Sequence, residues 1–330
     1  MKLKMKLVTL LVLCTASAIC FADVPRIMPA LSRQRIDLNF KQANDGFQQR
    51  WKEFAQNRTF VRYAPDFKDD ELAAKFLEIK KTRKNVYYEN FGELPQRSRM
   101  EYERSQILLS NGCYKVLHHM AFEYNHTHPS YNSSNVILNG HRFLALEGPQ
   151  KPEHVGNFLR LLVNYDVKQL VRLTRDEDHG FKSQNYWRDA VNVNKNEQQL
   201  LTFKLEGEDP TQTQPYSVLY YATDSWLDFS GTSPELLLQM VEQVRKDYKK
   251  GDIVAVHCSA GVGRTGTFIA AFLLLDEVDQ QLQRGVPKNR IKLSIEELVY
   301  KLSLQRAYAV AEPEQYVNLH QLVKMYVAKV

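Results

Sequence analysis

Residues 256–266 read VHCSAGVGRTG, and this stretch decides which kind of phosphate-binding loop the chain contains. Its three glycines match the G-x-G-x-x-G pattern of a dinucleotide-binding turn. Its threonine also gives it half of the pattern of a nucleoside-triphosphate loop. Neither of these loops uses the cysteine and the arginine at Cys258 and Arg264, so the correct interpretation has to explain these two residues.

A nucleoside-triphosphate loop reads G-x-x-x-x-G-K-[ST] and needs its lysine to reach the terminal phosphates. No lysine occurs between Lys250 and Lys288, which excludes this loop. A dinucleotide-binding unit needs a second strand that ends in an acidic residue about 20 positions further on. Here residues 284–298 read RGVPKNRIKLSIEEL, a polar turn followed by a predicted helix. The missing acidic residue makes dinucleotide binding the weaker alternative.

A cysteine-based phosphate site accounts for every residue of the stretch. Cys258 follows Ile253–Val256, a β-branched run typical of a strand buried on both faces, and Arg264 stands where the apolar helix predicted over Gly266–Leu282 begins. Small residues between them can curl so that their backbone N–H groups point inward and, with the helix N-terminus, favour a doubly charged phosphate and a thiolate. These phosphate-binding residues are Ser259, Ala260, Gly261, Val262 and Gly263.

The chemistry expected of such a site is nucleophilic displacement at phosphorus through a cysteinyl-phosphate intermediate. Cys258 is the predicted nucleophile, and Arg264 presents a planar fork to two phosphate oxygens. Thr265 can donate its hydroxyl to the sulfur and later help it to leave. We expect His257 to orient the loop through its ring N–H rather than to act as a base.

The run His257–Gly266, HCSAGVGRTG, resembles the H-C-x-x-G-x-x-R-[ST] signature loop of the protein tyrosine phosphatases. The resemblance extends from roughly Lys84 to Val323. It implies a single α/β domain with a central twisted mixed sheet and helices on both faces. It also implies a hydrolase that acts on phosphotyrosine in proteins without a cofactor or metal. We expect a monomer, although the sequence does not specify the oligomeric state.

A general acid must face the nucleophile, because a phenolate is a poor leaving group at neutral pH. The family supplies this acid from a mobile W-P-D loop. Residues 226–228 read WLD, so the resemblance makes Asp228 the acid; an ordinary loop carboxylate is the alternative. Leu227 replaces the proline and removes its fixed φ, from which we expect loop closure to be slower or differently poised.

The substrate-recognition loop of the family reads K-N-R-Y, and residues 84–87 read KNVY. The resemblance implies that Tyr87 flanks the phosphotyrosine ring by offset stacking, with its neighbour Tyr88 as the alternative. It also implies that Glu89 binds the substrate backbone. Such an aromatic wall makes the pocket deep, which favours phosphotyrosine over the shorter phosphoserine.

Residues 173–187 resemble a family segment with an arginine, an acid that pairs with the signature arginine, and a lysine that meets the acid-bearing loop. By position these are Arg175, Asp178 and Lys182. For Lys182 the alternative is a solvated surface charge. Residues 143–150, FLALEGPQ, resemble Y-I-A-T-Q-G-P, with glutamate in place of the glutamine.

The last family element, Q-T-x-x-Q, positions the water that hydrolyses the phosphocysteine. Residues 311–315 read AEPEQ, so the second glutamine is present as Gln315 while Ala311 replaces the first. Either the second half-reaction is slower, or Gln315 or Glu312 positions the water. Turnover can therefore fall without loss of the first step.

Residues 1–22 have the form of a secretory signal peptide, in which three lysines precede the apolar run Leu7–Ile19 and Ala22 ends the segment. The run is shorter than the roughly 20 apolar residues that span a bilayer. We predict cleavage after Ala22 and no stable membrane insertion, with an uncleaved anchor as the alternative. The lysine-led signal suggests a bacterial source, a periplasmic or secreted enzyme, and substrates outside the producing cell, including host proteins.

Charge and cysteine content exclude other classes. The net charge is +6, and removal of the signal takes away three lysines and no acidic residue, which leaves +3, too weak a charge to indicate nucleic-acid binding. The mature chain keeps Cys113 and Cys258, which are too few for a disulfide framework. Zinc binding by His118, His119, His126 and His128 is an alternative that the phosphatase mechanism does not need.

The remaining pattern predicts a helical arm over residues 23–80, packed on a catalytic domain over 81–330. Apolar spacing predicts arm helices at Gly46–Ala55 and Asp69–Lys80. Asn139-Gly140 predicts a hairpin between the strands 136–138 and 143–146. Further strands are expected at 169–173, 200–205 and 216–221, and further helices at 153–165, 234–249, 294–306 and 313–328.

Two other functions stay open. The loop could serve a phosphatase of phosphoinositides or phosphoserine, although it lacks the lysines that suit a multiply phosphorylated ring. It could also belong to a module that binds phosphotyrosine with weak turnover, a trap created by Leu227 and Ala311. Phosphate release from the three substrate types discriminates between them.

Overall fold

The computed structural model describes residues 32–89, 131, 133–178, 183–188, 190–193, 199–205, 214–306 and 308–330. Several predictions fall on other residues: the signal peptide, Cys113, the histidines between positions 118 and 128, and Lys182 lie outside the described ranges. Within those ranges no helix is long and apolar enough to cross a membrane.

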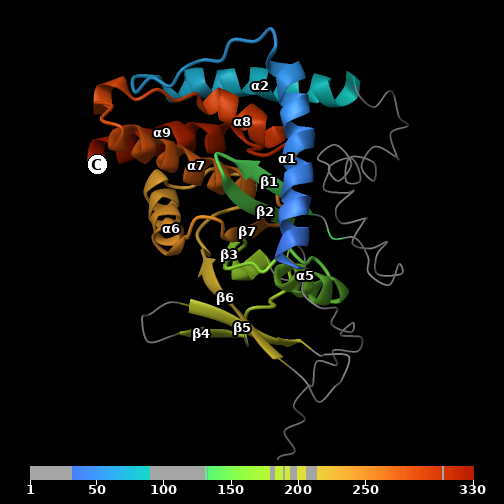
Figure 1. Ribbon diagram of the computed structural model, residues 1–330. Helices are drawn as coiled ribbons and strands as arrows, with labels where there is room; N and C mark the ends of the chain where they lie inside the picture. The colour runs from blue at the N-terminus through green and yellow to red at the C-terminus, as the bar shows by residue number, and fades with distance from the viewer. Residues whose placement is uncertain are drawn as a thin grey trace, which may run out of the picture.

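One mixed sheet forms the centre of the molecule, and its described strands follow the order β1-β2-β7-β3-β6-β5-β4 (Figure 1). The four central strands β2, β7, β3 and β6 run parallel to one another, whereas the pairs β1–β2, β6–β5 and β5–β4 are antiparallel. The strands are β1 Ser133–Leu138, β2 His141–Glu147, β3 Gln169–Arg172, β4 Val191–Val193, β5 Gln199–Leu205, β6 Gln214–Ala222 and β7 Ile253–Cys258.

Helices cover both faces of the sheet, and alternate residues of β7 belong to different cores. Val254 and Val256 pack with α6 to α9, whereas Ile253 and Ala255 pack with α5 and the first half of α1. The helices are α1 Arg33–Ala55, α2 Asp69–Glu89, α5 Pro152–Asn164, α6 Pro234–Asp247, α7 Gly263–Gln283, α8 Ile295–Ser303 and α9 Pro313–Lys329, with short 3-10 turns η1 Asp176–Asp178 and η2 Lys288–Arg290. The expected single α/β domain with helices on both faces is thus confirmed.

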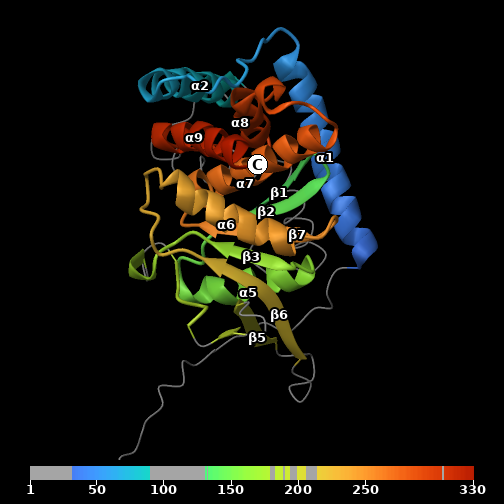
Figure 2. The ribbon, with the colours of Figure 1, turned by 90° about the vertical axis from the view of Figure 1, so that its left-hand side faces the viewer.

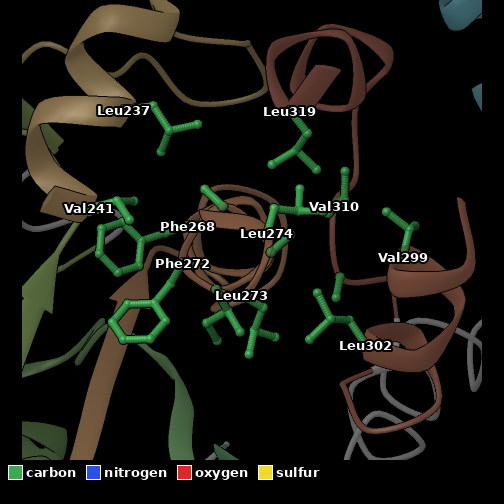
Figure 3. Packing of buried hydrophobic residues seen from close by; sticks show 14 of the residues in the cluster. Leu237, Val241, Phe268, Phe272, Leu273, Leu274, Val299, Leu302, Val310 and Leu319 are labelled. Atoms are coloured by element: carbon green, nitrogen blue, oxygen red, sulfur yellow. The ribbon is translucent and has the colours of Figure 1, made fainter. Parts of the chain in front are cut away.

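The helix after the signature loop, α7, is buried along most of its length (Figure 3). Phe268 points toward Val241 of α6 and Phe272 meets Phe143 of β2, while Leu274 lies toward the segment around Val310 and the α9 residue Leu319. A helix that is apolar all round is stable only inside a core. Because other helices pack around α7, its first turn is fixed with respect to the sheet.

The two N-terminal helices pack on the rest of the fold. Helix α1 lies alongside β1, and α2 lies against α9 (Figures 1 and 2). The predicted apolar face of α1 is confirmed: Phe47 is buried, and the Trp51 and Phe54 rings contact the Phe60 ring, at 5.4 and 6.5 Å between centroids. Phe54 also meets Tyr300 of α8 at 4.9 Å.

Most predicted elements are present, and their ends differ for local reasons. Asn139 and Gly140 have φ of 51° and 81°, the backbone that a two-residue hairpin requires. Helix α7 begins at Gly263, three residues before the predicted start, so Arg264 lies within its first turn. Helix α2 runs to Glu89, past the boundary expected at residue 80, so residues 84–89 are helical where the resemblance implies a loop.

Candidate active site

The signature loop begins at the carboxyl end of β7 and joins α7. Cys258 is the last residue of β7 and is 3% exposed. The loop is held against β2 by the Gly148 N–H, which donates to the Ser259 carbonyl at 2.9 Å. Gly261 has φ of +68°, and a Cβ there would lie 2.0 Å from the Leu146 carbonyl oxygen. Only glycine can therefore occupy this position beside the β2 backbone.

Arg306 binds backbone carbonyls of the signature loop. Its Nε donates to the Gly261 carbonyl at 2.9 Å, its Nη2 donates to the Ala260 carbonyl at 2.8 Å, and the side chain is buried. In a planar trans peptide the N–H points opposite to the carbonyl. Arg306 therefore turns the N–H groups of Gly261 and Val262 away from itself. This role could not be predicted from the sequence, because an arginine near the C-terminus of a helix is a common residue there.

Replacing Arg306 with methionine is expected to destabilise the protein by about 2–4 kcal/mol, because two buried carbonyls lose a charged donor. Denaturant unfolding measures the change. Arg306→Lys keeps the charge, but an ammonium group cannot donate to both carbonyls with the planar geometry of a guanidinium. It should therefore recover only part of the lost stability. Equal stability of Arg306→Met and the unaltered protein would contradict the role that we assign to this side chain.

The signature arginine is buried among acidic and carbonyl oxygens. Arg264 is 1% exposed, and its Nη2 donates to Asp228 Oδ1 at 2.9 Å. Its Nη1 donates to the Trp226 carbonyl at 3.0 Å and lies 3.5 Å from Asp178 Oδ2. The predicted pairing of Asp178 with the signature arginine is confirmed. Asp178 also accepts from the backbone N–H of Arg175 at 3.2 Å.

The segment that carries Asp228 connects β6 to α6, and we call residues 223–233 the acid loop. Trp226 is fully buried, and its indole N–H donates to the Ser230 carbonyl at 3.1 Å, which closes the loop on itself. Leu227 and Phe229, on either side of Asp228, are 54% and 77% exposed. The leucine that replaces proline thus points into solvent, whereas the neighbouring tryptophan anchors the loop.

Gln315 lies between the acid loop and the start of α9. Its Nε2 donates to the Ser230 carbonyl at 3.1 Å, and its Oε1 accepts from Ala311 N at 2.9 Å and Glu312 N at 3.3 Å. The Glu312 side chain in return caps α9. A Cβ on Gly263 would lie 3.0 Å from Gln315 Nε2, so this amide borders the signature loop.

His257 is completely buried and neutral. Burial lowers its pKa from 6.5 to about 3, so the ring carries no charge at physiological pH. Its Nε2 meets the hydroxyl of Tyr186, and its Nδ1 lies 3.2 Å from the Cys258 carbonyl. This arrangement agrees with a ring that orients the loop through an N–H. Thr265 is also buried, and its hydroxyl has no hydrogen-bond partner in the described part of the chain.

The structure brings together the predicted residues of the signature loop, the acid loop and α9. It does not test the predicted site residues that lie outside the described atoms. Side chains of residues 84–89 are outside the described atoms, so the roles of Tyr87 and Glu89 stay predictions. The same holds for Lys182. No group of three or more potential metal ligands occurs among the described residues.

Comparison with known proteins places the chain in a family. A model described as protein-tyrosine phosphatase matches residues 100–324. Receptor-type tyrosine-protein phosphatase eta of Gallus gallus is 27% identical over 71% of this chain and 16% of its own length. Receptor-type tyrosine-protein phosphatase H of Homo sapiens is 30% identical over 55% and 17%, and tyrosine phosphatase H3 of Microplitis demolitor bracovirus (isolate Webb) is 26% identical over 58% and 63%.

The match begins after the segment 84–89 and includes the signature loop, the acid loop and the start of α9. The chain spans about a sixth of the length of the two receptor-type relatives. Because the matched region covers more than half of the chain and contains the buried cysteine with its arginine and aspartate, this chain belongs to the protein-tyrosine phosphatase family.

Proposed function

We propose that this protein hydrolyses phosphotyrosine in proteins through a cysteinyl-phosphate intermediate. The observation that carries the proposal is the convergence of three side chains: Cys258 at the end of β7, Arg264 in the first turn of α7, and Asp228 paired with that arginine at 2.9 Å. A nucleophile, a phosphate ligand and a carboxyl group from separate elements meet in one place, as acid-assisted phosphoryl transfer requires.

In the first step the Cys258 thiolate attacks phosphorus, and the bond from phosphorus to the tyrosine oxygen breaks. The incoming phosphate displaces the Asp228 carboxylate from Arg264, the displaced carboxylate takes up a proton from solvent, and the resulting acid gives that proton to the departing phenolate. The phosphoryl group is then bound to sulfur. The signature-loop N–H groups and Arg264 neutralise its charge.

In the second step a water molecule attacks the phosphocysteine, and the sulfur leaves as a thiolate. Asp228, now a carboxylate, accepts the proton of the water. The unpartnered hydroxyl of Thr265 is free to donate to the sulfur as it leaves. Gln315 is already hydrogen-bonded to the backbone of Ala311, Glu312 and Ser230, so its amide is less available to position the water. This supports a second step that is slower than the first.

The depth of the nucleophile supports phosphotyrosine as the substrate class. Cys258 is 3% exposed, so a phosphorus atom must reach well below the surface to meet its sulfur. The aryl spacer of phosphotyrosine gives that reach, and the short side chain of phosphoserine does not. We also propose that the substrates are proteins, host proteins among them, and that the enzyme acts as a monomer.

The signal-like residues 1–22 lead us to propose export to the periplasm or the medium. Fractionation of producing cells tests this, with the N-terminal residue of the mature chain read by mass spectrometry. A processed enzyme outside the cytoplasm, beginning near Asp23, is the expected result. A full-length enzyme confined to the cytosol would refute export without affecting the proposed chemistry.

The activity is tested by phosphate release from a phosphotyrosine peptide, a phosphoserine peptide and a phosphoinositide. We expect release from the first alone. Asp228→Ala should lower kcat/KM on the phosphotyrosine peptide about 10²- to 10⁴-fold, since the leaving group loses its proton donor. The matched control, Glu235→Ala, removes an exposed carboxylate from the start of α6 and should leave the rate unchanged. Tight phosphopeptide binding without release would identify a binding module instead.

A further inference from the structure

Two buried polar side chains from outside the acid loop hold its two ends. The first is Arg172, the last residue of β3, whose Nη2 donates to Asp224 Oδ1 at 3.0 Å. The same carboxylate oxygen accepts from the backbone N–H of Asp176 at 3.2 Å. Arg172 is itself fixed, because its Nε donates to the Tyr220 hydroxyl at 2.6 Å and its guanidinium lies 3.9 Å from the Trp187 ring centroid.

The second side chain is Asn318, on the second turn of α9 and 8% exposed. Its Oδ1 accepts from the backbone N–H of Thr232 at 2.7 Å, and its Nδ2 donates to Gln321 Oε1 at 3.3 Å, which sets the orientation of the amide. A Cβ on Gly231 would lie 2.4 Å from Asn318 Oδ1. A glycine before Thr232 therefore lets the loop approach the amide closely enough for this bond.

Between these ends the loop has little apolar anchoring apart from Trp226. Leu227 and Phe229 are exposed, and Leu227 lacks the fixed φ of a proline. A chain segment that is fixed at one end only can adopt more conformations than a segment fixed at both ends. Each additional conformation lowers the population of the conformation that presents Asp228. The geometry of the acid therefore depends on how firmly positions 224 and 232 are held.

We propose that Arg172 and Asn318 are positioning residues for the acid, acting through Asp224 and Thr232. They set the ends of the acid loop so that the segment between them returns Asp228 to the leaving oxygen, and they supply the stiffness that the replaced proline would give. Neither side chain touches the substrate. The proposal rests on the proposed phosphatase activity, whose acid is Asp228.

The test measures kcat/KM for Asp224→Ala and Asn318→Ala on aryl phosphates whose leaving phenols span a pKa from about 7 to about 10. A misplaced acid harms the poorest leaving group most, because that group depends most on protonation. We expect a fall of about 10-fold or more on phenyl phosphate, since small misplacements cost up to about 10²-fold. The most acidic phenol should show a fall of less than about threefold, which makes the dependence on leaving-group pKa steeper.

Matched controls separate positioning from general damage. Asp176→Ala removes the other carboxylate that Arg172 binds at 3.0 Å but leaves Asp224 in place. Lys324→Ala removes an exposed side chain from α9 and leaves Asn318, Gln321 and the bond to Thr232 in place. Both should keep the slope of the unaltered enzyme. Controls as steep as Asp224→Ala and Asn318→Ala, or test variants with an unchanged slope, would overturn the proposal.

Hydrogen exchange of residues 225–232 gives a readout that needs no turnover. Asp224→Ala and Asn318→Ala should speed exchange of this peptide, whereas exchange of β7 stays slow. Unchanged exchange in the loop would overturn the proposal even if rates fell. An unaltered enzyme that releases no phosphate would instead overturn the proposed function, and the exchange data would still decide whether the two side chains hold the loop.

Discussion

Replacing Cys258 with serine is expected to reduce phosphate release from a phosphotyrosine peptide on the order of 10⁴-fold or more, as loss of a catalytic nucleophile does elsewhere. A serine hydroxyl stays protonated at neutral pH, and His257 beside it is too weak a base to activate it, because burial lowers its pKa to about 3 and both its nitrogens are engaged. Initial rates of phosphate release measure the effect.

The loss should be confined to chemistry. The signature-loop N–H groups and Arg264 remain in Cys258→Ser, so the phosphopeptide should still bind, which calorimetry can measure. Cys113→Ser is the matched control, because it removes the other cysteine thiol that lies outside residues 1–22 and should leave the rate unchanged. Residual activity above about one per cent in Cys258→Ser would contradict a cysteinyl intermediate.

Replacing Gly261 with alanine should have the largest effect on stability, about 3 kcal/mol or more, because strain and overlap add. Alanine at a φ of +68° is strained, and its Cβ would overlap the Leu146 carbonyl at 2.0 Å. Neither β2 nor Gly261 can yield easily, since Leu146 and Val262 are buried and Arg306 binds the Gly261 carbonyl. Denaturant unfolding gives the change in free energy.

Gly285→Ala isolates the two causes. Gly285 has a similar φ of +79°, but a Cβ there would meet nothing within 4 Å. It should cost only the conformational penalty, about 1–2 kcal/mol. If the two variants were destabilised equally, the close approach of the loop to β2 would contribute nothing, and the packing argument for Gly261 would be wrong.

Elements defined by a short local pattern could be predicted from the sequence. Asn139-Gly140 predicts its hairpin because two positive φ angles suit few other residue pairs. The run 253–256 predicts a strand buried on both faces because it contains no polar residue. The signature loop also predicted the elements on either side of it. Its cysteine marks the end of a strand, its arginine marks the start of a helix, and the short loop between them limits the distance between the two residues.

What could not be predicted depends on contacts between distant segments. Arg172, Arg306 and Asn318 are buried polar residues whose partners lie on other elements, and nothing near them in the chain identifies those partners. The length of α2 was underestimated for a related reason. Arg83, in its last third, is buried and donates to the carbonyls of Ala309 and Val310, a contact that extends the helix beyond its amphipathic part.

The ion pair between Arg264 and Asp228 has a consequence for product release. The buried Arg264 guanidinium is paired with the Asp228 carboxylate, so under the proposed mechanism phosphate enters by exchange of one anion for another. The carboxylate acts as an internal competitor that lowers the affinity for every phosphate monoester and for free phosphate alike. Under the proposed mechanism, we expect the return of Asp228 to Arg264 after hydrolysis to help expel the phosphate product, at the expense of tight binding.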